Sequence, residues 1–404
     1  MSLPTIIVLY TSICVVAAIP ITNSTGIPRP LAAAITVTSV LLLQQFLDDH
    51  ALLASLPLWK TILKSYLFLQ TLQSLNNLFF DPLYLDPSLP AQNAWVAATQ
   101  HFSSQCWTAC KANWRWRAIG TDREAKNTPC IPDAAPSRSR MISRHLMISI
   151  SCFIILDLMS SMPQPDPAVA MAAEKEHILG RLDAVSSEEL SFRVAATVGF
   201  WFGTFLGVNA FYSCLAVVCM AIFRSDPAVW RPAFGDVREA YSVRRFWGYA
   251  VVPSWLDKLT DHRSVFWHQM LRNPLTGPAQ YLVQALGLPS KGLFTRYFRH
   301  HTIFLSSGVF HLLADRSLGV PTHESGSLWF FQINAVAIMA EDAFQELCQR
   351  SRVLRNWPKA YLGYLWVAFI LTVVTPPWSY PQARVGGQME LLPLKIVEKL
   401  SSLG

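Results

Sequence analysis

Residues 195–223 read AATVGFWFGTFLGVNAFYSCLAVVCMAIF, a run that contains no charged side chain. A helix needs about 20 apolar residues to cross the hydrocarbon core of a bilayer. This run is long enough to do so, and it places the chain among helical integral membrane proteins.

Seven further stretches are apolar and qualify, or nearly qualify, as membrane spans. They comprise residues 3–21, 31–47, 58–80, 141–162, 301–313, 328–347 and 360–374. The first has no basic flank and no small-residue cleavage site, so we interpret it as a retained span and not as a removed signal peptide. The sequence therefore predicts an all-α, polytopic membrane helix bundle of about eight spans.

Composition supports this class and argues against others. The chain has 404 residues, of which 52% are hydrophobic and only 15% are charged, whereas soluble domains carry about 25% charge. The net charge of +7 comes from basic residues in loops between apolar runs, so we expect membrane lipid and no nucleic acid as a partner. Eight cysteines occur without a CxxC pair, and we expect no metal site.

The distribution of charge predicts the topology. Loops after the third, fifth and seventh stretches are rich in Arg and Lys, whereas the loop after the fourth is acidic. Basic loops lie on the cytoplasmic side of membranes. We therefore expect one membrane domain over residues 1–404, with cytosolic loops at 81–140 and 224–300.

A histidine lies within the sixth stretch, in the sequence FLSSGVFHLL of residues 304–313. Ionisable groups at membrane depth are costly and usually face a cavity or a partner. Ser307 and Asp315 lie one helical turn before and after His311. A neutral imidazole is able to take the proton of an attacking hydroxyl. A structural histidine bonded to a neighbouring helix is the alternative.

Two loop sequences carry further candidate residues. Residues 242–248 read SVRRFWG and residues 265–272 read VFWHQMLR, with sixteen residues between them. Residues 117–127 read RAIGTDREAKN and offer basic groups to the phosphates of coenzyme A. The alternatives are an interfacial aromatic anchor for the first and a solvated positive loop for the second.

Together these sequences resemble the fungal wax-synthase-type branch of the membrane-bound O-acyltransferases. The branch has patterns like R-G-I-G-T-x-W-x-V-K-N, S-x-R-x-F-W-G-x-x-W-H-Q and F-x-x-S-G-x-x-H, in this order. The resemblance implies a multi-helix fold in the endoplasmic reticulum and acyl transfer from acyl-CoA to a hydroxyl. It implies catalytic roles for His311, His268 and Gln269, and substrate binding by Trp267, Trp247, Ser307, Lys126 and Asn127.

The chain departs from these patterns at two places. Ala118 replaces a glycine in the early motif, and Asp122 and Arg123 stand where Pro and Trp are usual. Residues 249–264 interrupt the middle motif, and their removal restores the family spacing. We interpret them as a retained intron, for which back-translation permits donor, branch and acceptor sequences; a genuine surface insertion is the alternative, because loops accept extra residues cheaply. A genuine insert is expected to separate Phe246 and Trp247 from Trp267 and His268, and to lower activity.

The predicted function is transfer of an acyl group, acetyl from acetyl-CoA, to a lipophilic alcohol such as a terpenoid or meroterpenoid. No cofactor is expected to be bound, and acetyl-CoA or another acyl-CoA is the cosubstrate. One alternative is a long-chain wax-ester or sterol O-acyltransferase. An alternative of another class is a membrane transporter or a non-catalytic scaffold, against which the sequence shows no internal repeat.

Overall fold

The computed structural model describes residues 28–49, 57–80, 110, 115–121, 123–129, 137–248, 265–289, 291–350 and 359–386. The regular structure in these residues is entirely helical, which agrees with the predicted class. The chain divides into two compact units, one formed by Met1–Lys126 with Gln269–Gly319 and the other by Asn127–His268 with Val320–Gly404. The predicted first span, residues 3–21, and the insert at 249–264 lie outside the described residues.

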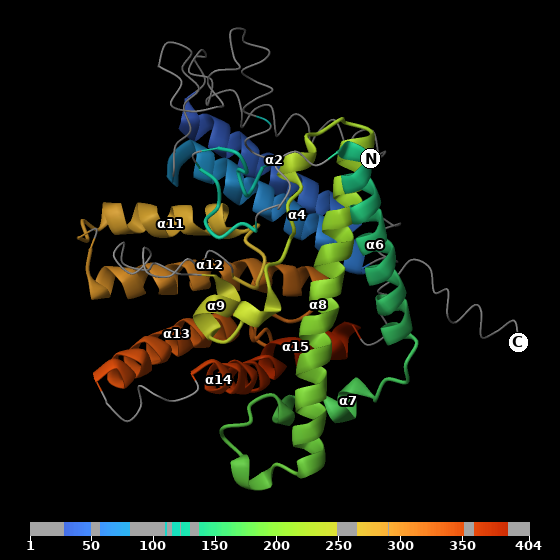
Figure 1. Cartoon of the computed structure of the whole chain (residues 1–404), viewed down its shortest axis with the longest axis vertical. Coiled ribbons are helices and arrows are strands. Elements are labelled where there is room, and N and C mark those ends of the chain that lie inside the picture. Colours follow the sequence, from blue (N-terminus) through green and yellow to red (C-terminus); the bar gives the residue numbers. More distant parts are fainter. Residues whose placement is uncertain are drawn as a thin grey trace, which may run out of the picture. The chain divides into compact units, whose positions relative to one another are not determined.

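In the described residues of the first unit, four long helices are present (Figure 1). They are α2 (Arg29–Asp49), α4 (Pro57–Leu75) with its π-helical extension η2 (Asn76–Phe80), α11 (Arg272–Ala285) and α12 (Leu293–Leu318). Helix α4 packs against α2 through Leu67, which joins Val40, Leu43 and Leu47 in an apolar cluster. It also packs against α11 and α12, so α4 contacts each of the other long helices described in this unit.

Two long helices, α6 (Arg138–Ser160) and α8 (Ser187–Ala221), lie side by side in the second unit (Figure 1). The remaining long helices of this unit are α13 (Ser327–Arg350), α14 (Lys359–Val374) and α15 (Pro376–Gly386). Short elements connect them: α7 (Pro167–Ala170), η3 (Ala173–Lys175), η4 (Leu182–Ala184), η5 (Pro227–Val229), η6 (Val237–Glu239) and α9 (Val243–Trp247).

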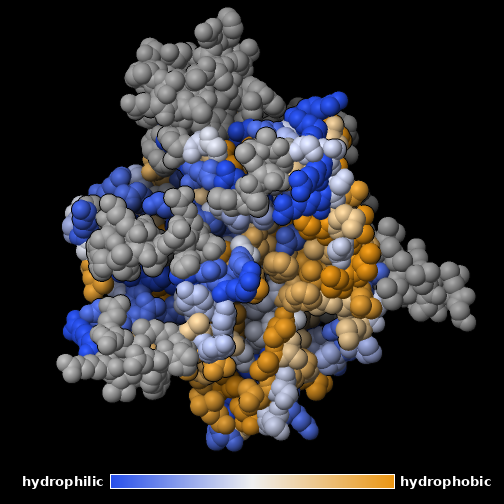
Figure 2. All heavy atoms as spheres, in the orientation of Figure 1, coloured by the Kyte–Doolittle hydropathy of each residue, from blue (hydrophilic) through white to orange (hydrophobic). Residues whose placement is uncertain are grey.

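Apolar side chains cover the outer surface of α6 and α8. Figure 2 shows them gathered over these helices, and they include Met147, Ile154, Val198 and Ile222. Burying such side chains in hydrocarbon is favourable, whereas exposing so many to water is not. This surface is the one that a membrane would cover.

Three described helices are long and apolar enough to cross a membrane: α2, α6 and α8. The pair α14 and α15, bent by 48° at the break between them, would add a fourth. The predicted spans at 58–80, 301–313 and 328–347 do form helices. Their polar and charged residues make them too hydrophilic to count as candidate membrane spans. The structure therefore supports a helical membrane protein with three or four candidate spans among the described residues, and the count of eight is not confirmed.

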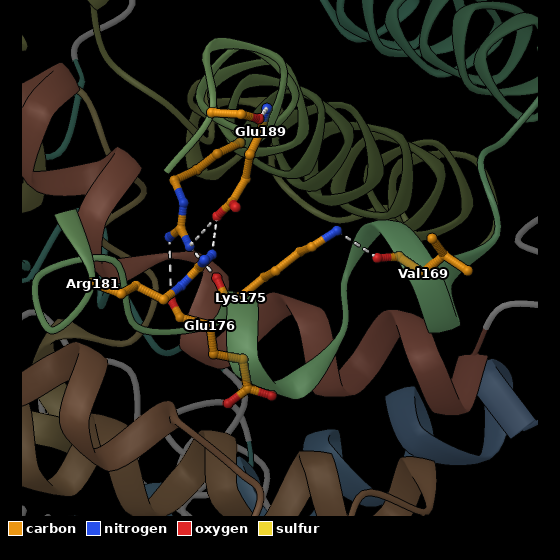
Figure 3. Close-up of polar contacts among 7 residues, drawn as sticks. Val169, Lys175, Glu176, Arg181 and Glu189 are labelled. Atoms are coloured by element: carbon orange, nitrogen blue, oxygen red, sulfur yellow. Dashed lines mark hydrogen bonds and ion pairs between the residues drawn. The ribbon is translucent and has the colours of Figure 1, made fainter. Parts of the chain in front are cut away.

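The acidic segment between α6 and α8 is held by arginines. Figure 3 shows Arg181 paired with Glu189. The buried Arg193 donates to the backbone carbonyls of Lys175 and Glu176. Arg384 of α15 adds an ion pair to Glu176 at 2.7 Å. These pairs neutralise part of the acidic charge and connect the segment to the helices of its own unit.

Candidate functional site

The middle motif begins with α9, a short helix with a defined cap at each end. The hydroxyl of Ser242 accepts a hydrogen bond from the backbone N–H of Arg245 at 3.1 Å, which caps the first turn. Gly248 ends the helix with φ +79°, a left-handed conformation that glycine adopts without penalty. Asn127, from the early motif, donates from Nδ2 to the carbonyl of Gly248 at 3.3 Å.

Helix α13 fixes α9 through three polar side chains. The carboxylate of Glu341 accepts from the backbone N–H groups of Val243 and Arg244, which would otherwise have no partner at a helix start. Asp342 pairs with the guanidinium of Arg244. The indole N–H of Trp247 donates to Oδ1 of Asn334 at 2.9 Å. Sequence reasoning missed these residues, which lie in a predicted span and about 90 positions from their partners.

The two halves of the middle motif are in direct contact. The N–H of Phe266 donates to the carbonyl of Arg245 at 3.2 Å, and the N–H of Trp267 donates to that of Phe246 at 2.8 Å. The rings of Phe246 and Trp267 are stacked, with centroids 5.3 Å apart. The expectation that an insert would separate these residues is therefore wrong, because backbone hydrogen bonds hold the residues that flank the insert beside each other.

Aromatic rings surround the motif tryptophans. Trp267 lies edge-on to Trp201 of α8, with centroids 4.8 Å apart, and Trp247 contacts Phe330 and Phe331 of α13. Trp247 and Trp267 are each 7% exposed. The structure thus places both in an aromatic core, as support for the motif. Trp201 could not be singled out from sequence, because it lies in an unbroken apolar run.

A cavity of about 120 Å³ lies next to this core. Its lining includes His145, Asn209, Phe234 and Gly235. Both ring nitrogens of His145 have partners, the hydroxyl of Ser213 and the carbonyl of Trp230, each at 3.2 Å. The ring of His268 lies edge-on to that of Phe234, with ring centroids 5.6 Å apart.

A tyrosine precedes the motif helix and contacts one of its arginines. The guanidinium of Arg245 lies over the ring of Tyr241 at 4.5 Å, and Arg245 also pairs with Glu239. Burial raises the pKa of the Tyr241 hydroxyl, and the opposing effect of Arg245 is smaller. Tyr241 is therefore a neutral phenol at physiological pH, and it supports Arg245 through a cation–π contact.

His311 belongs to the first unit, on α12. Its side chain is half-buried, whereas Ser307 and Asp315, one turn to either side, are buried. The preceding residue, Phe310, stacks on Phe68 of α4 with ring centroids 5.7 Å apart. Gln269 is in the same unit and is buried, and its Oε1 accepts from Arg272 at 3.1 Å. The candidate residues therefore fall into two groups, one in each unit.

The early motif forms a compact loop. Ala118 has φ +48° and Asn127 has φ +63°, both unusual for residues other than glycine. The N–H of Ala125 donates to the carbonyl of Arg117 at 2.8 Å, which closes the loop. Arg117 is buried and Lys126 is exposed. Within the described ranges, no cluster of three His, Cys, Asp or Glu side chains is arranged to hold a metal ion.

Comparison with known proteins places these motifs in a family. Residues 253–333, which include Trp267–Gln269 and His311, match the profile of the Membrane bound O-acyl transferase family. The acetyltransferase ataH of Aspergillus terreus is 30% identical over 66% of this chain and 86% of its own length. The chain belongs to the membrane-bound O-acyltransferase family. No solved structure matches it.

Other curated relatives of the chain have similar names. The acetyltransferase aurG of Calcarisporium arbuscula is 32% identical over 66% of the chain, and the acetyltransferase fsoF of Humicola fuscoatra is 28% identical over 65%. These alignments span 62% and 63% of the two relatives. The resemblance to a fungal acyltransferase family is confirmed.

Proposed function

We propose that this protein transfers an acetyl group from acetyl-CoA to a hydroxyl of a lipophilic alcohol, of terpenoid or meroterpenoid type, in fungal secondary metabolism. The observation that carries the proposal is His311, a half-buried imidazole within the family-matched residues, flanked by buried Ser307 and Asp315. Relatives named as acetyltransferases favour a short acyl group over the long chain of a wax-ester or sterol enzyme.

The proposed mechanism is general-base catalysis without a covalent enzyme intermediate. His311 takes the proton of the alcohol as its oxygen attacks the thioester carbonyl. The C–S bond then breaks, the ester leaves, and the proton passes from His311 to the coenzyme A thiolate. A donor to the developing oxyanion would lower the barrier, and Gln269, in the same unit, is proposed for that role. The same role stays proposed for His268.

The other candidate residues are proposed as support. Trp247 and Trp267 would hold the motif in position, and Ser307 would line the helix face beside His311. Lys126 and Asn127 would serve the phosphate end of the acyl-CoA. We further propose a single membrane domain over 1–404 in the endoplasmic reticulum, with eight spans and cytosolic loops at 81–140 and 224–300.

The test uses microsomes that contain the expressed protein, labelled acetyl-CoA and a panel of terpenoid alcohols. We expect label in the alcohol, little transfer from palmitoyl-CoA, and loss of at least 100-fold in rate for His311→Ala, the range that general bases contribute. Full activity of His311→Ala would remove it from the mechanism. Transport of the alcohol without acetyl transfer would favour the alternative of a transporter.

A further inference from the structure

One face of helix α4 is polar and buried inside the first unit. Gln70, Gln73 and Asn77 follow Tyr66 at intervals of four, three and four residues, so all four lie on one side of the helix. Ser74 lies beside them, and Gln70 and Ser74 are each 1% exposed. A helix that only packed against its neighbours would carry apolar side chains here. We call Tyr66, Gln70, Gln73, Ser74 and Asn77 the α4 polar face.

Several of these polar atoms have no hydrogen-bond partner among the described residues. They are both atoms of the Gln70 amide, Oε1 of Gln73 and Oγ of Ser74. A buried polar group left unpaired costs about 1–3 kcal/mol. Several together would cost a large part of the roughly 5–15 kcal/mol by which proteins are stable. Native proteins therefore pair such groups, with protein, ordered water or a ligand.

The surroundings of this face point to a ligand. The ring of Tyr66 contacts that of Trp116, with centroids 5.5 Å apart. The indole N–H of Trp116 is also buried without a partner in the part of the chain that the structure describes. Trp116 immediately precedes the early motif of residues 117–127, and the basic residues Arg115, Arg117 and Lys126 lie beside or within that motif. Unpaired amides thus lie on a helix that a positively charged loop touches.

We infer that the α4 polar face binds the pantetheine arm of the acyl-CoA cosubstrate. Each amide of that arm offers one donor and one acceptor, and the unpaired amide of Gln70 provides a carbonyl acceptor and an NH2 donor to match them. From Gln70 to Asn77 the face extends about 10 Å along the helix, which suits an extended chain. A terpenoid skeleton or a hydrocarbon chain offers few such groups. The basic loop then lies toward the phosphate end of the ligand.

Helix α4 also packs against the catalytic helix α12, where the ring of Phe68 stacks on Phe310, the neighbour of His311. Phe68 lies on the opposite side of α4 from the polar face, so this contact connects the two helices and does not itself place the arm beside His311. This assignment rests on the proposed function, since it takes an acyl-CoA as the donor. It names the residues that recognise the part of the donor between its phosphates and its thioester.

The experiment compares Gln70→Leu and Ser74→Ala with the unaltered protein in detergent. We expect the Kd for a non-hydrolysable thioether analogue of acetyl-CoA to rise at least tenfold in Gln70→Leu, and KM for acetyl-CoA and acetyl-pantetheine to rise by a similar factor. KM for the alcohol should stay the same. Without ligand, the melting temperature of Gln70→Leu should be equal or higher, because the substitution removes no hydrogen bond.

A matched control is Thr71→Val on the same helix. The hydroxyl of Thr71 already donates to the carbonyl of Leu67 at 2.9 Å, so acetyl-CoA affinity should not change. An unaltered Kd for the thioether analogue in Gln70→Leu would overturn the assignment, as would a large drop in its ligand-free melting temperature. Analogue binding that depends on Gln70 without acetyl transfer would support the assignment and refute the proposed function. Acetyl transfer by Gln70→Leu with an unaltered KM for acetyl-CoA would support the proposed function and refute the assignment.

Discussion

The indole N–H of Trp247 donates a hydrogen bond to Oδ1 of Asn334 across 2.9 Å, and both side chains are buried. The bond connects the family motif on α9 to helix α13. Asn334 also donates to the carbonyl of Phe330 in its own helix at 2.9 Å, which orients its amide. The orientation of Trp247 is therefore set by a residue outside the motif.

Asn334→Leu should leave the Trp247 N–H buried and unpaired, and lower the free energy of unfolding by about 1–3 kcal/mol. Acyl transfer should fall with it. The double variant Asn334→Leu with Trp247→Phe removes both partners, so its loss should be smaller than the sum of the single losses. Thermal unfolding in detergent measures all three. Strictly additive losses would show that the bond does not couple the two residues.

Glu341 provides a second connection to the same helix. Glu341→Ala should cost about 2–3 kcal/mol, because it leaves two N–H groups at the start of α9 without their acceptor. Glu341→Gln keeps one acceptor oxygen and should cost about half as much. The control is Glu346→Gln on the same helix, whose exposed ion pair with Arg350 contributes under about 1 kcal/mol. A loss no larger than that of the control would refute the capping role of Glu341.

The early-motif loop contains an alanine at a position where the family pattern has glycine. Ala118 has φ +48°, a conformation that costs residues with a Cβ about 1 kcal/mol. Ala118→Gly should therefore raise stability by roughly 0.5–1 kcal/mol, and Ala118→Val should lower it. Ala125 in the same loop is not among the described residues with positive φ, so Ala125→Gly should be destabilising. Melting temperatures of the three variants test the prediction, and a loss in Ala118→Gly would contradict it.

Apolar runs were sufficient to predict the positions of most helices. Helices α6 and α8 coincide with predicted spans because lipid-facing side chains leave a long uncharged run. Helix α12 begins at Leu293 and not near residue 301, because Arg296, Arg299 and His300 lowered the hydropathy of a segment that is nonetheless helical. Hydropathy indicates whether a helical segment faces lipid or water. It therefore did not locate the polar first turns of this helix.

The candidate site was predictable in part. His311 and the tryptophans were found because they lie in short motifs of fixed spacing. Asn334 and Glu341 were not, since each acts on a residue 87 or more positions away, and sequence spacing carries no record of such contacts. The residues of the α4 polar face lie within the predicted span 58–80, and the sequence pattern did not identify them as a site. The significance of this face depends on how deeply its polar atoms are buried and on whether they have hydrogen-bond partners, and both require a three-dimensional structure.

The segment 249–264 gives the last prediction. Backbone hydrogen bonds join the residues that flank it, Arg245 with Phe266 and Phe246 with Trp267. With the sixteen residues removed, both pairs are five positions apart, a separation that backbone hydrogen bonds span in a single wide turn. Deletion of 249–264, which joins Gly248 to Val265, should therefore preserve both bonds and leave the melting temperature and acetyl-transfer rate equal or higher.

The matched control deletes 248–264 instead. That variant lacks the glycine that ends α9 with φ +79° and shortens each separation by one residue, so it should lose stability and activity. Sequencing of the transcript tests the origin of the segment, and a message without these codons is expected. Unfolding of the 249–264 deletion would show that the segment itself holds the two halves of the motif together. Retained folding and activity would show that the hydrogen bonds between its flanks are sufficient.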